Sequence, residues 1–277
     1  MPADINARGA HARTALITGA SAGIGAEFAL QLAARGMDLV LVARRRNRLE
    51  QLATQLKEKY GVSVTVMAYD LADPGAPKSI AASLRDLDIH IDYLVNNAGY
   101  GVPGKLNTAT WRTHSDFIQV LVTCVTEMTY LLLPAMQARG WGRIVNVSSI
   151  AGLLPGSGGH TLYAASKAFL VKFSESLFIE NQGTGVNVVA LCPGFTYSEF
   201  HDVTGTRELV SKLPKRMWAE AAVVVRTGIE ALERKNPSPV VIPGWYYRWI
   251  ALLTRLIPQS LLLRYMRRRA REFRNTE

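Results

Sequence analysis

Short apolar runs alternate with longer helical stretches along most of this 277-residue chain. The apolar runs are rich in β-branched residues and bounded by glycine or small polar residues, as buried strands are. They cover residues 14–18, 38–43, 63–68, 91–95 and 240–242. Helical periodicity follows the first run, over residues 26–35. Strands that alternate with helices favour a parallel sheet, so the pattern predicts an α/β fold.

A glycine-rich segment joins the first predicted strand to the first predicted helix, and it reads Gly19-Ala-Ser21-Ala-Gly23-Ile24-Gly25. Glycines let a backbone approach a pyrophosphate, and a helix N-terminus offers N–H groups to it. The spacing is G-x-x-x-G-x-G, which does not match the usual G-x-G-x-x-G dinucleotide pattern. Taken alone, the segment could be a purely structural turn.

The second predicted strand ends at Arg44-Arg45-Arg46. In dinucleotide folds an acidic residue here binds the ribose 2′-hydroxyl, whereas an arginine accommodates a 2′-phosphate. Arg44 therefore favours NADP(H), with NAD(H) as the second choice. The alternative for Arg45, Arg46 and Arg48 is the solvated first turn of the next helix.

Small polar residues follow the third and fourth predicted strands. Asp70 and Leu71 follow one strand, and Asn96-Asn97-Ala98-Gly99 follows the other. Ligands of open parallel sheets bind at the carboxyl ends of strands. We therefore expect Asp70 to accept from an adenine amino group and Asn97-Ala98-Gly99 to pass beneath the dinucleotide. A simple turn is the alternative for the asparagine segment.

Tyr163 and Lys167 are four residues apart, a spacing that places both on one face of a helix. An ammonium beside a phenol favours the phenolate, so we expect the pKa of Tyr163 to fall from about 10. Such a phenol can donate or accept a proton. The same spacing also occurs on plain solvated helices.

Together with Ser148-Ser149 and Cys192-Pro193-Gly194, these motifs resemble the short-chain dehydrogenase/reductase family over roughly residues 14–200. The resemblance implies a Rossmann-like, doubly wound parallel sheet with helices on both faces, a nicotinamide cofactor, and hydride transfer to or from a carbonyl carbon. It also implies homodimers or homotetramers built from the fourth and fifth helices.

The resemblance implies roles for single residues. Tyr163 is the general acid in reduction, Lys167 holds the nicotinamide ribose and lowers the tyrosine pKa, and Ser149 binds the substrate oxygen. Ser198 occupies the family's usual threonine position. The expected cofactor-binding set is Gly19, Ser21, Gly23, Ile24, Gly25, Arg44, Asp70, Leu71, Asn97, Ala98, Gly99, Tyr163, Lys167, Pro193, Gly194 and Thr196.

Two departures from the family pattern stand out. An asparagine in the long fourth helix commonly supports a water near the lysine, and Leu121 takes its place here. A leucine cannot hydrogen-bond a water, so another group serves or turnover is reduced. The gap from Ser149 to Tyr163 is 14 residues, one more than usual, and an extra loop residue costs little.

Composition and charge limit the kinds of ligand and partner that the protein is expected to have. Cys124 and Cys192 are expected to be buried thiols, and the five histidines lack metal-ligand spacing, so no metal is expected. The net charge of +10 is concentrated in residues 245–277, without an aromatic–basic platform, so no nucleic-acid partner is expected. The first 13 residues lack an apolar signal region, which predicts a cytoplasmic protein.

We expect a single domain with two extensions: a tail at residues 1–13, a catalytic domain at 14–243 and a basic, apolar-rich helical extension at 244–277. Arginines and Pro258 interrupt the apolar runs of the extension, so neither run predicts a spanning helix. Tryptophan and tyrosine beside a basic apolar helix suit peripheral contact with a membrane. A substrate lid or an oligomer contact is the alternative.

Residues 193–213 are expected to form a mobile loop and short helix over the substrate, with Phe200, His201 and a flexible segment at 204–206. The candidate pocket residues are largely apolar: Tyr100, Val102, Leu153, Leu154 and Phe200. We therefore predict NADPH-dependent reduction of a ketone or 3-oxo group on a lipophilic or acyl substrate. The alternatives are a nucleotide-binding scaffold or sensor with weak catalysis, and a membrane-peripheral lipid ketone reductase.

Overall fold

The structure, a computed structural model, describes residues 12–156, 158–159, 161–199, 211, 214–234 and 236–272. Seven parallel strands form one sheet in the order β3-β2-β1-β4-β5-β6-β9. The strands are β1 (Thr14–Thr18), β2 (Asp38–Ala43), β3 (Val64–Ala68), β4 (Tyr93–Asn96), β5 (Gly142–Val147), β6 (Val186–Leu191) and β9 (Val240–Val241). The order reverses between β1 and β4, and ligands of such sheets bind at this switch point.

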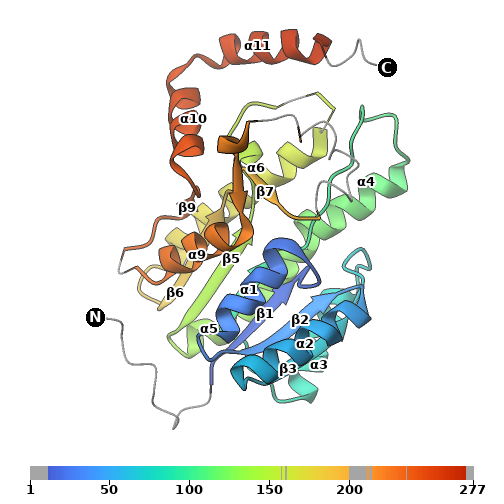
Figure 1. Cartoon of the computed structure of the whole chain (residues 1–277), viewed down its shortest axis with the longest axis vertical. Coiled ribbons are helices and arrows are strands. Elements are labelled where there is room, and N and C mark those ends of the chain that lie inside the picture. Colours follow the sequence, from blue (N-terminus) through green and yellow to red (C-terminus); the bar gives the residue numbers. More distant parts are fainter. Residues whose placement is uncertain are drawn as a thin grey trace.

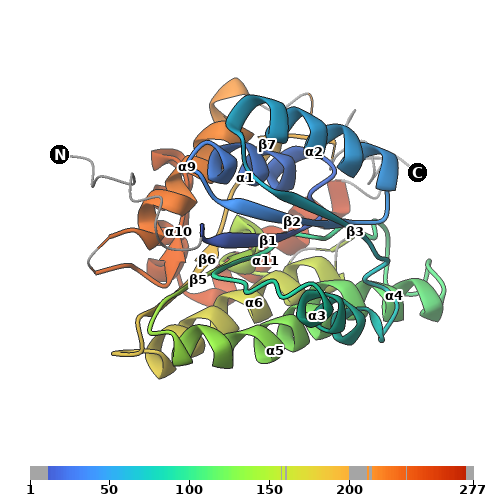
Figure 2. The same ribbon diagram turned by 90° about the horizontal axis from the view of Figure 1, so that it is seen from below.

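Helices cover both faces of the sheet (Figure 2). One layer contains α1 (Gly23–Ala33), α2 (Arg46–Tyr60) and α9 (Ala221–Leu232). The other contains α3 (Ala76–Asp86), α4 (Trp111–Ile118), α5 (Cys124–Ala138) and α6 (Thr161–Glu180). Outside these layers, α10 (Trp245–Leu256) and α11 (Gln259–Glu272) lie at the edge of the molecule (Figure 1, red). The predicted doubly wound α/β fold with a helical C-terminal extension is confirmed.

One loop prediction was wrong. Residues 195–197, expected in a mobile lid, form the strand β7 (Phe195–Tyr197), which pairs with β8 (Trp218–Glu220) in a second small sheet. Contacts with Trp218 explain why residues 195–197 form a regular strand. The Trp218 ring lies 5.6 Å from that of Phe195 and stacks on Tyr197 at 4.8 Å. The other predicted lid residues, Phe200, His201 and 204–206, lie outside the described residues, as does most of the N-terminal tail.

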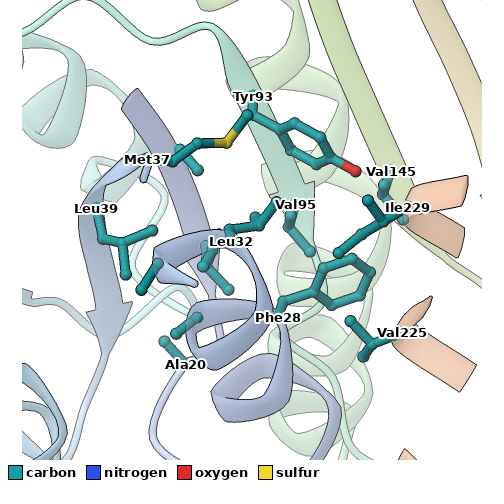
Figure 3. Close-up of a cluster of buried hydrophobic side chains, with 14 of the residues drawn as sticks. Ala20, Phe28, Leu32, Met37, Leu39, Tyr93, Val95, Val145, Val225 and Ile229 are labelled. Atoms are coloured by element: carbon teal, nitrogen blue, oxygen red, sulfur yellow. The ribbon is translucent and has the colours of Figure 1, made fainter. Parts of the chain in front are cut away.

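The core on the α1 side is formed by aromatic and aliphatic side chains (Figure 3). Phe28 and Leu32 of α1 are fully buried between the sheet and α9, which contributes Val225 and Ile229. α1 starts at Gly23, within the glycine-rich segment. The packing of Phe28 therefore also fixes where the helix N-terminus points.

A buried polar ladder joins the central strands to α6. Asn96 at the end of β4 donates to Asn146 of β5 at 2.9 Å, and Asn146 donates to Ser174 of α6 at 2.9 Å. Asn96 also donates to Thr129 of α5 at 3.2 Å. Buried amides are costly unless paired, so this ladder sets the register of α6 against the sheet.

Among the described residues, one helical run, Trp111–Ala138, has the length and the apolar composition needed to cross a membrane. It comprises α4, the π-helical turn η1 (Gln119–Thr123) and α5. Phe117, Leu121 and Met128 are buried against the sheet. These contacts are those of a core helix.

We expect Phe28→Ala to lower the free energy of unfolding by about 3–5 kcal/mol, because it leaves a cavity between α1 and α9. Urea denaturation measures the loss. Leu87→Ala, at a side chain 56% exposed at the C-terminal end of α3, is the control and should change stability by less than about 1 kcal/mol. Equal losses in the two variants would contradict the assignment of this core.

Candidate active site

A cleft of about 730 Å³ opens at the carboxyl ends of the central strands. This volume is typical of small-molecule and cofactor sites. Every residue predicted to bind cofactor or to act in catalysis lines the cleft except Gly25. Residues distributed from Gly19 to Thr196 in the sequence therefore meet in one place.

The glycine-rich turn forms one wall of the cleft, and its shape depends on missing side chains. Gly19 has a φ of +66°, and a Cβ there would lie 2.8 Å from the Asn97 amide nitrogen. A Cβ on Gly25 would collide with the Gly19 carbonyl oxygen, so Gly25 packs the turn rather than lining the cleft. Asn97 locks this arrangement by donating to the Thr18 carbonyl at 2.9 Å and to the Gly19 carbonyl at 3.3 Å.

Two arginines meet a carboxylate at the mouth of the cleft. Arg45 donates to Ser21 Oγ at 2.9 Å and to Glu199 at 3.0 Å, and Arg48 donates to Glu199 at 2.5 Å. Arg48 and Arg45 hold the pKa of Glu199 below its usual range. Arg45 therefore reaches into the cleft, where the sequence left it as a candidate for a solvated helix turn. Arg44, the predicted arginine, lines the cleft beside it.

Glu199 was missed by sequence reasoning. It lies more than 150 residues along the chain from the arginines it pairs with, inside a segment predicted to be a mobile loop. A single glutamate in such a segment carries no periodic or motif signal. The ion pairs of Glu199 with Arg45 and Arg48 join the end of this segment to the start of α2, and the preceding residues are held in β7 by pairing with β8.

Close backbone contacts bring the serine after β5 to α6. Ser148 donates to the Lys167 carbonyl at 2.7 Å, and a Cβ on Gly152 would lie 2.6 Å from the same carbonyl. The short turn η2 (Ile150–Gly152) therefore rests directly on α6. This contact places Ser149 in a side-chain hydrogen bond with Tyr163.

Lys167 is buried within α6, one turn beyond Tyr163. Its Nζ donates to the Val147 carbonyl at 2.8 Å and lies 5.7 Å from the centroid of the Tyr163 ring. Burial lowers the pKa of Lys167 to about 8, with a smaller opposing effect from Cys192. The side chain is thus close to the point at which it changes charge near neutral pH.

The expected fall in the pKa of Tyr163 is not found in the structure. Burial raises this pKa, and the hydrogen bond with Ser149 opposes the rise. Desolvation is the larger effect, and the Lys167 ammonium donates to the Val147 carbonyl. The four-residue spacing correctly predicted that Tyr163 and Lys167 are neighbours, but it could not report that both side chains are buried.

Leu121 lies beside Lys167, where the family pattern has its asparagine. It is buried in η1, and a Cβ on Gly99 would lie 3.6 Å from Leu121 Cγ and 3.8 Å from Lys167 Nζ. The leucine brings no polar group to this spot. The Val147 carbonyl is the partner that Lys167 has instead.

The apolar pocket candidates divide into three groups. Tyr100 lines the main cleft, with its ring edge-on to Phe117 at 5.5 Å. Val102 lines a separate, much smaller cavity next to Tyr163. Leu153 and Leu154 pack beneath α10 and do not line the cleft, which corrects their expected position.

Metal-ligating side chains do not gather in the described part of the chain, where no group of three or more His, Cys, Asp or Glu could hold an ion. Cys124 and Cys192 are buried, unbridged thiols, as predicted. Burial raises the pKa of each thiol to about 12.

Residues 13–208 match the family described as short chain dehydrogenase. The chain is 32% identical to the 7beta-hydroxysteroid dehydrogenase of Collinsella aerofaciens, over 87% of this chain and 89% of the relative. It is 30% identical to the very-long-chain 3-oxoacyl-CoA reductase of Bos taurus, over 92% and 82%. A short-chain dehydrogenase from Sphingobium yanoikuyae, solved in complex with NADPH, superimposes with a TM-score of 0.78 at 34% identity, covering 90% of this chain and 94% of that one.

We expect Lys167→Met to raise the free energy of unfolding at pH 7 by up to about 3 kcal/mol, because it removes a charge that is costly to bury. Between pH about 8 and 10.5 the unfolded wild type binds more protons than the folded protein, so wild-type stability rises with pH. The advantage of the variant should therefore shrink across that range. Thermal unfolding at several pH values measures it.

Lys172→Met is the matched control, because Lys172 lies on the same helix with its side chain 79% exposed. Its effect on stability should be small and should not follow this pH dependence. An advantage of Lys167→Met that stays constant from pH 7 to above 10.5 would contradict a folded-state pKa near 8.

Proposed function

This chain belongs to the short-chain dehydrogenase/reductase family, and we propose that it is an NADPH-dependent reductase of lipophilic ketones or 3-oxoacyl groups. Members of this family are oxidoreductases that act on CH–OH and C=O groups with a nicotinamide cofactor. The observation that carries the proposal is the meeting of Ser149, Tyr163 and buried Lys167 in the cleft that the glycine-rich turn enters.

The residues of the cleft fit a dinucleotide. The turn at Gly19 and Gly25 has no room for side chains and leads into the N-terminus of α1, which suits a pyrophosphate. Asp70, Pro193, Gly194 and Thr196 line the same cleft. In our proposal Asp70 faces the adenine, and the other three residues face the nicotinamide. A bound nicotinamide supplies or takes the hydride; the protein contributes position and the proton.

Three side chains perform the acid–base part of the reaction. Ser149 donates a hydrogen bond to the substrate oxygen and stabilises the negative charge that develops there. Tyr163 gives its phenolic proton to that oxygen during reduction and takes it back during alcohol oxidation. Lys167, once charged, steadies the phenolate that remains and binds the ribose hydroxyls. A raised pKa of Tyr163 suits this role, since the phenol stays protonated until it reacts.

NADP(H) is the cofactor we propose, with NAD(H) as the weaker alternative. Arg44, Arg45 and Ser21 line the cleft. We propose that the adenosine lies beside them, because charge-assisted hydrogen bonds from arginine suit a 2′-phosphate. Glu199 pairs with Arg45 and Arg48 at the same place, so a phosphate must compete with its carboxylate. Neighbours of this fold crystallised with NADPH support the choice.

The substrate class rests on the apolar walls around Tyr163, which include Tyr100, Val120 and Ile150. A hydroxysteroid dehydrogenase and a very-long-chain 3-oxoacyl-CoA reductase among the relatives support a lipophilic ketone. The scaffold alternative rests on Leu121 alone, which contributes no polar group near Lys167. An assay of NADPH oxidation over a panel of ketones separates the two, because a scaffold would bind NADPH without consuming it.

Assembly, location and domain division stay predictions. We propose a homodimer or homotetramer formed by α5 and α6, where Tyr130, Phe169 and Ile179 are exposed. We also propose a cytoplasmic enzyme, with the catalytic domain at residues 14–243 and the extension at 244–277. Size measured in solution tests the first of these, and cell fractionation the second.

We expect Tyr163→Phe to lower turnover of any accepted ketone by about 10²–10⁴-fold, because the variant lacks the proton donor. The dissociation constant for NADPH should change by less than about threefold, since the aromatic ring is kept. Absorbance of the reduced nicotinamide measures the first and its fluorescence the second. Tyr130→Phe, on the exposed face of α5, is the control. Full activity of Tyr163→Phe would refute the assignment.

We expect Arg45→Ala to weaken NADPH binding by about tenfold and leave NADH binding unchanged, because only NADPH carries the 2′-phosphate. Glu199→Gln should tighten NADPH binding, since it removes the competing carboxylate. Arg46→Ala is the matched control, because Arg46 pairs with Glu50 on the solvated side of α2. Equal losses for both cofactors in Arg45→Ala would contradict a 2′-phosphate site.

A further inference from the structure

Helix α10 is apolar on two opposite faces, and only one of them is covered. Tyr247 and Ala251 on the inner face are buried against Ile150 and its neighbours. The outer face exposes two large rings and three leucines, which a helix of about 100° per residue gathers within about a third of its circumference. They are Trp245, Trp249, Leu252, Leu253 and Leu256.

The inner face fixes how α10 is oriented. Tyr247 Oη accepts from the Phe195 backbone N–H at 3.3 Å and donates to the Met217 carbonyl at 2.7 Å. Its ring covers Gly194, where a Cβ would collide with it. These contacts hold α10 against the segment that lines the nicotinamide end of the cleft. The outer face is therefore presented in a fixed direction.

Three further apolar side chains are exposed after the outer face of α10, namely Ile257, Leu261 and Leu263. We refer to these three side chains and the five on α10 as the C-terminal patch. Both helices lie at the edge of the molecule, outside the layers around the sheet (Figure 1). An exposed apolar face such as that of α10 marks an interaction site in soluble proteins.

Charge around the C-terminal patch has one sign. Residues 245–271 contain seven arginines and no acidic residue. Arg255, Arg264 and Arg267 are exposed on the same two helices as the apolar side chains. A partner must therefore offer both an apolar interior and negative charge.

We propose that the C-terminal patch docks on the surface of an anionic phospholipid bilayer. Tryptophan and leucine enter the interface between headgroups and acyl chains, while arginines beside them bind lipid phosphates. A second copy of the same patch is a poorer partner, because it would bring the same positive charge against these arginines. The docking does not depend on which ketone is reduced.

Docking would hold the nicotinamide end of the cleft close to the bilayer. α10 is bonded through Tyr247 to Phe195, which lines that end. A lipophilic substrate dissolved in the bilayer would then have a short path to the site. This consequence rests on the proposed function, whereas the docking itself does not.

Sedimentation of the full chain with vesicles tests the proposal. We expect binding to vesicles of phosphatidylcholine mixed with phosphatidylglycerol at low salt, release at high salt, and little binding to phosphatidylcholine alone. Trp249→Ser combined with Leu253→Ser should weaken the binding by about tenfold or more. The matched control is Trp111→Ser with Leu87→Ser, which removes one exposed tryptophan and one exposed leucine elsewhere and should bind as wild type does.

A charge variant gives a second measurement that does not alter packing. Arg255→Gln, Arg264→Gln and Arg267→Gln together should weaken binding to the anionic vesicles by about tenfold or more. Lys57→Gln, Lys59→Gln and Arg226→Gln remove the same charge from other exposed positions and should have a small effect. Each variant is first required to keep the wild-type thermal unfolding midpoint.

Three outcomes would overturn the proposal. The first is no sedimentation of wild type with anionic vesicles at any salt concentration. The second is an equal weakening of vesicle binding by a patch variant and by its control, which would mean that net charge or general hydrophobicity determines the binding. The third is a wild-type dimer that Trp249→Ser with Leu253→Ser dissociates while vesicle binding is absent, which would make the patch an interface between copies.

Discussion

The buried Lys167 ammonium is the constraint on which the rest of the site depends. A charge at that depth is costly, and Lys167 donates a hydrogen bond to the Val147 carbonyl at 2.8 Å. The polar ladder from Asn96 to Ser174 and the contact of Ser148 with the Lys167 carbonyl hold α6 where this bond can form. The same contacts hold Tyr163 against Ser149. Burial of Lys167 thus lowers the stability of the fold and at the same time keeps Ser149, Tyr163 and Lys167 close together.

Three glycines are needed for the shape of the cleft, because each allows a close contact that a side chain would prevent. Gly25 allows the turn to close on itself, and Gly152 allows η2 to rest on α6. Gly194 leaves room for the Tyr247 ring, which ties the C-terminal extension to the cleft wall. Each glycine thus permits one close approach, and together these approaches bring β1, β5, β6 and α10 to a common site.

Most of the fold could be predicted because its signals are local. The runs at residues 14–18 and 38–43 became β1 and β2 with the same bounds, since apolar β-branched residues between turns have few other uses. Ser149, Tyr163 and Lys167 were found through motifs that carry their own spacing. Glu199, the Tyr247 contacts and the β7–β8 pair could not be found, because each joins segments far apart in the sequence. The direction of the Tyr163 pKa also depended on burial, which spacing does not report.

The positive charge of the chain has at least two separate uses, which the total of +10 hides. Arg45 lines the cleft, and both Arg45 and Arg48 pair with Glu199, so their charge is partly balanced. A phosphate that binds there must displace the carboxylate of Glu199. The arginines of α10 and α11 lie in a segment without acidic residues, beside exposed apolar side chains. Balanced charge in a cleft suits a small, doubly charged ligand. Unbalanced charge beside an apolar face suits an extended anionic surface.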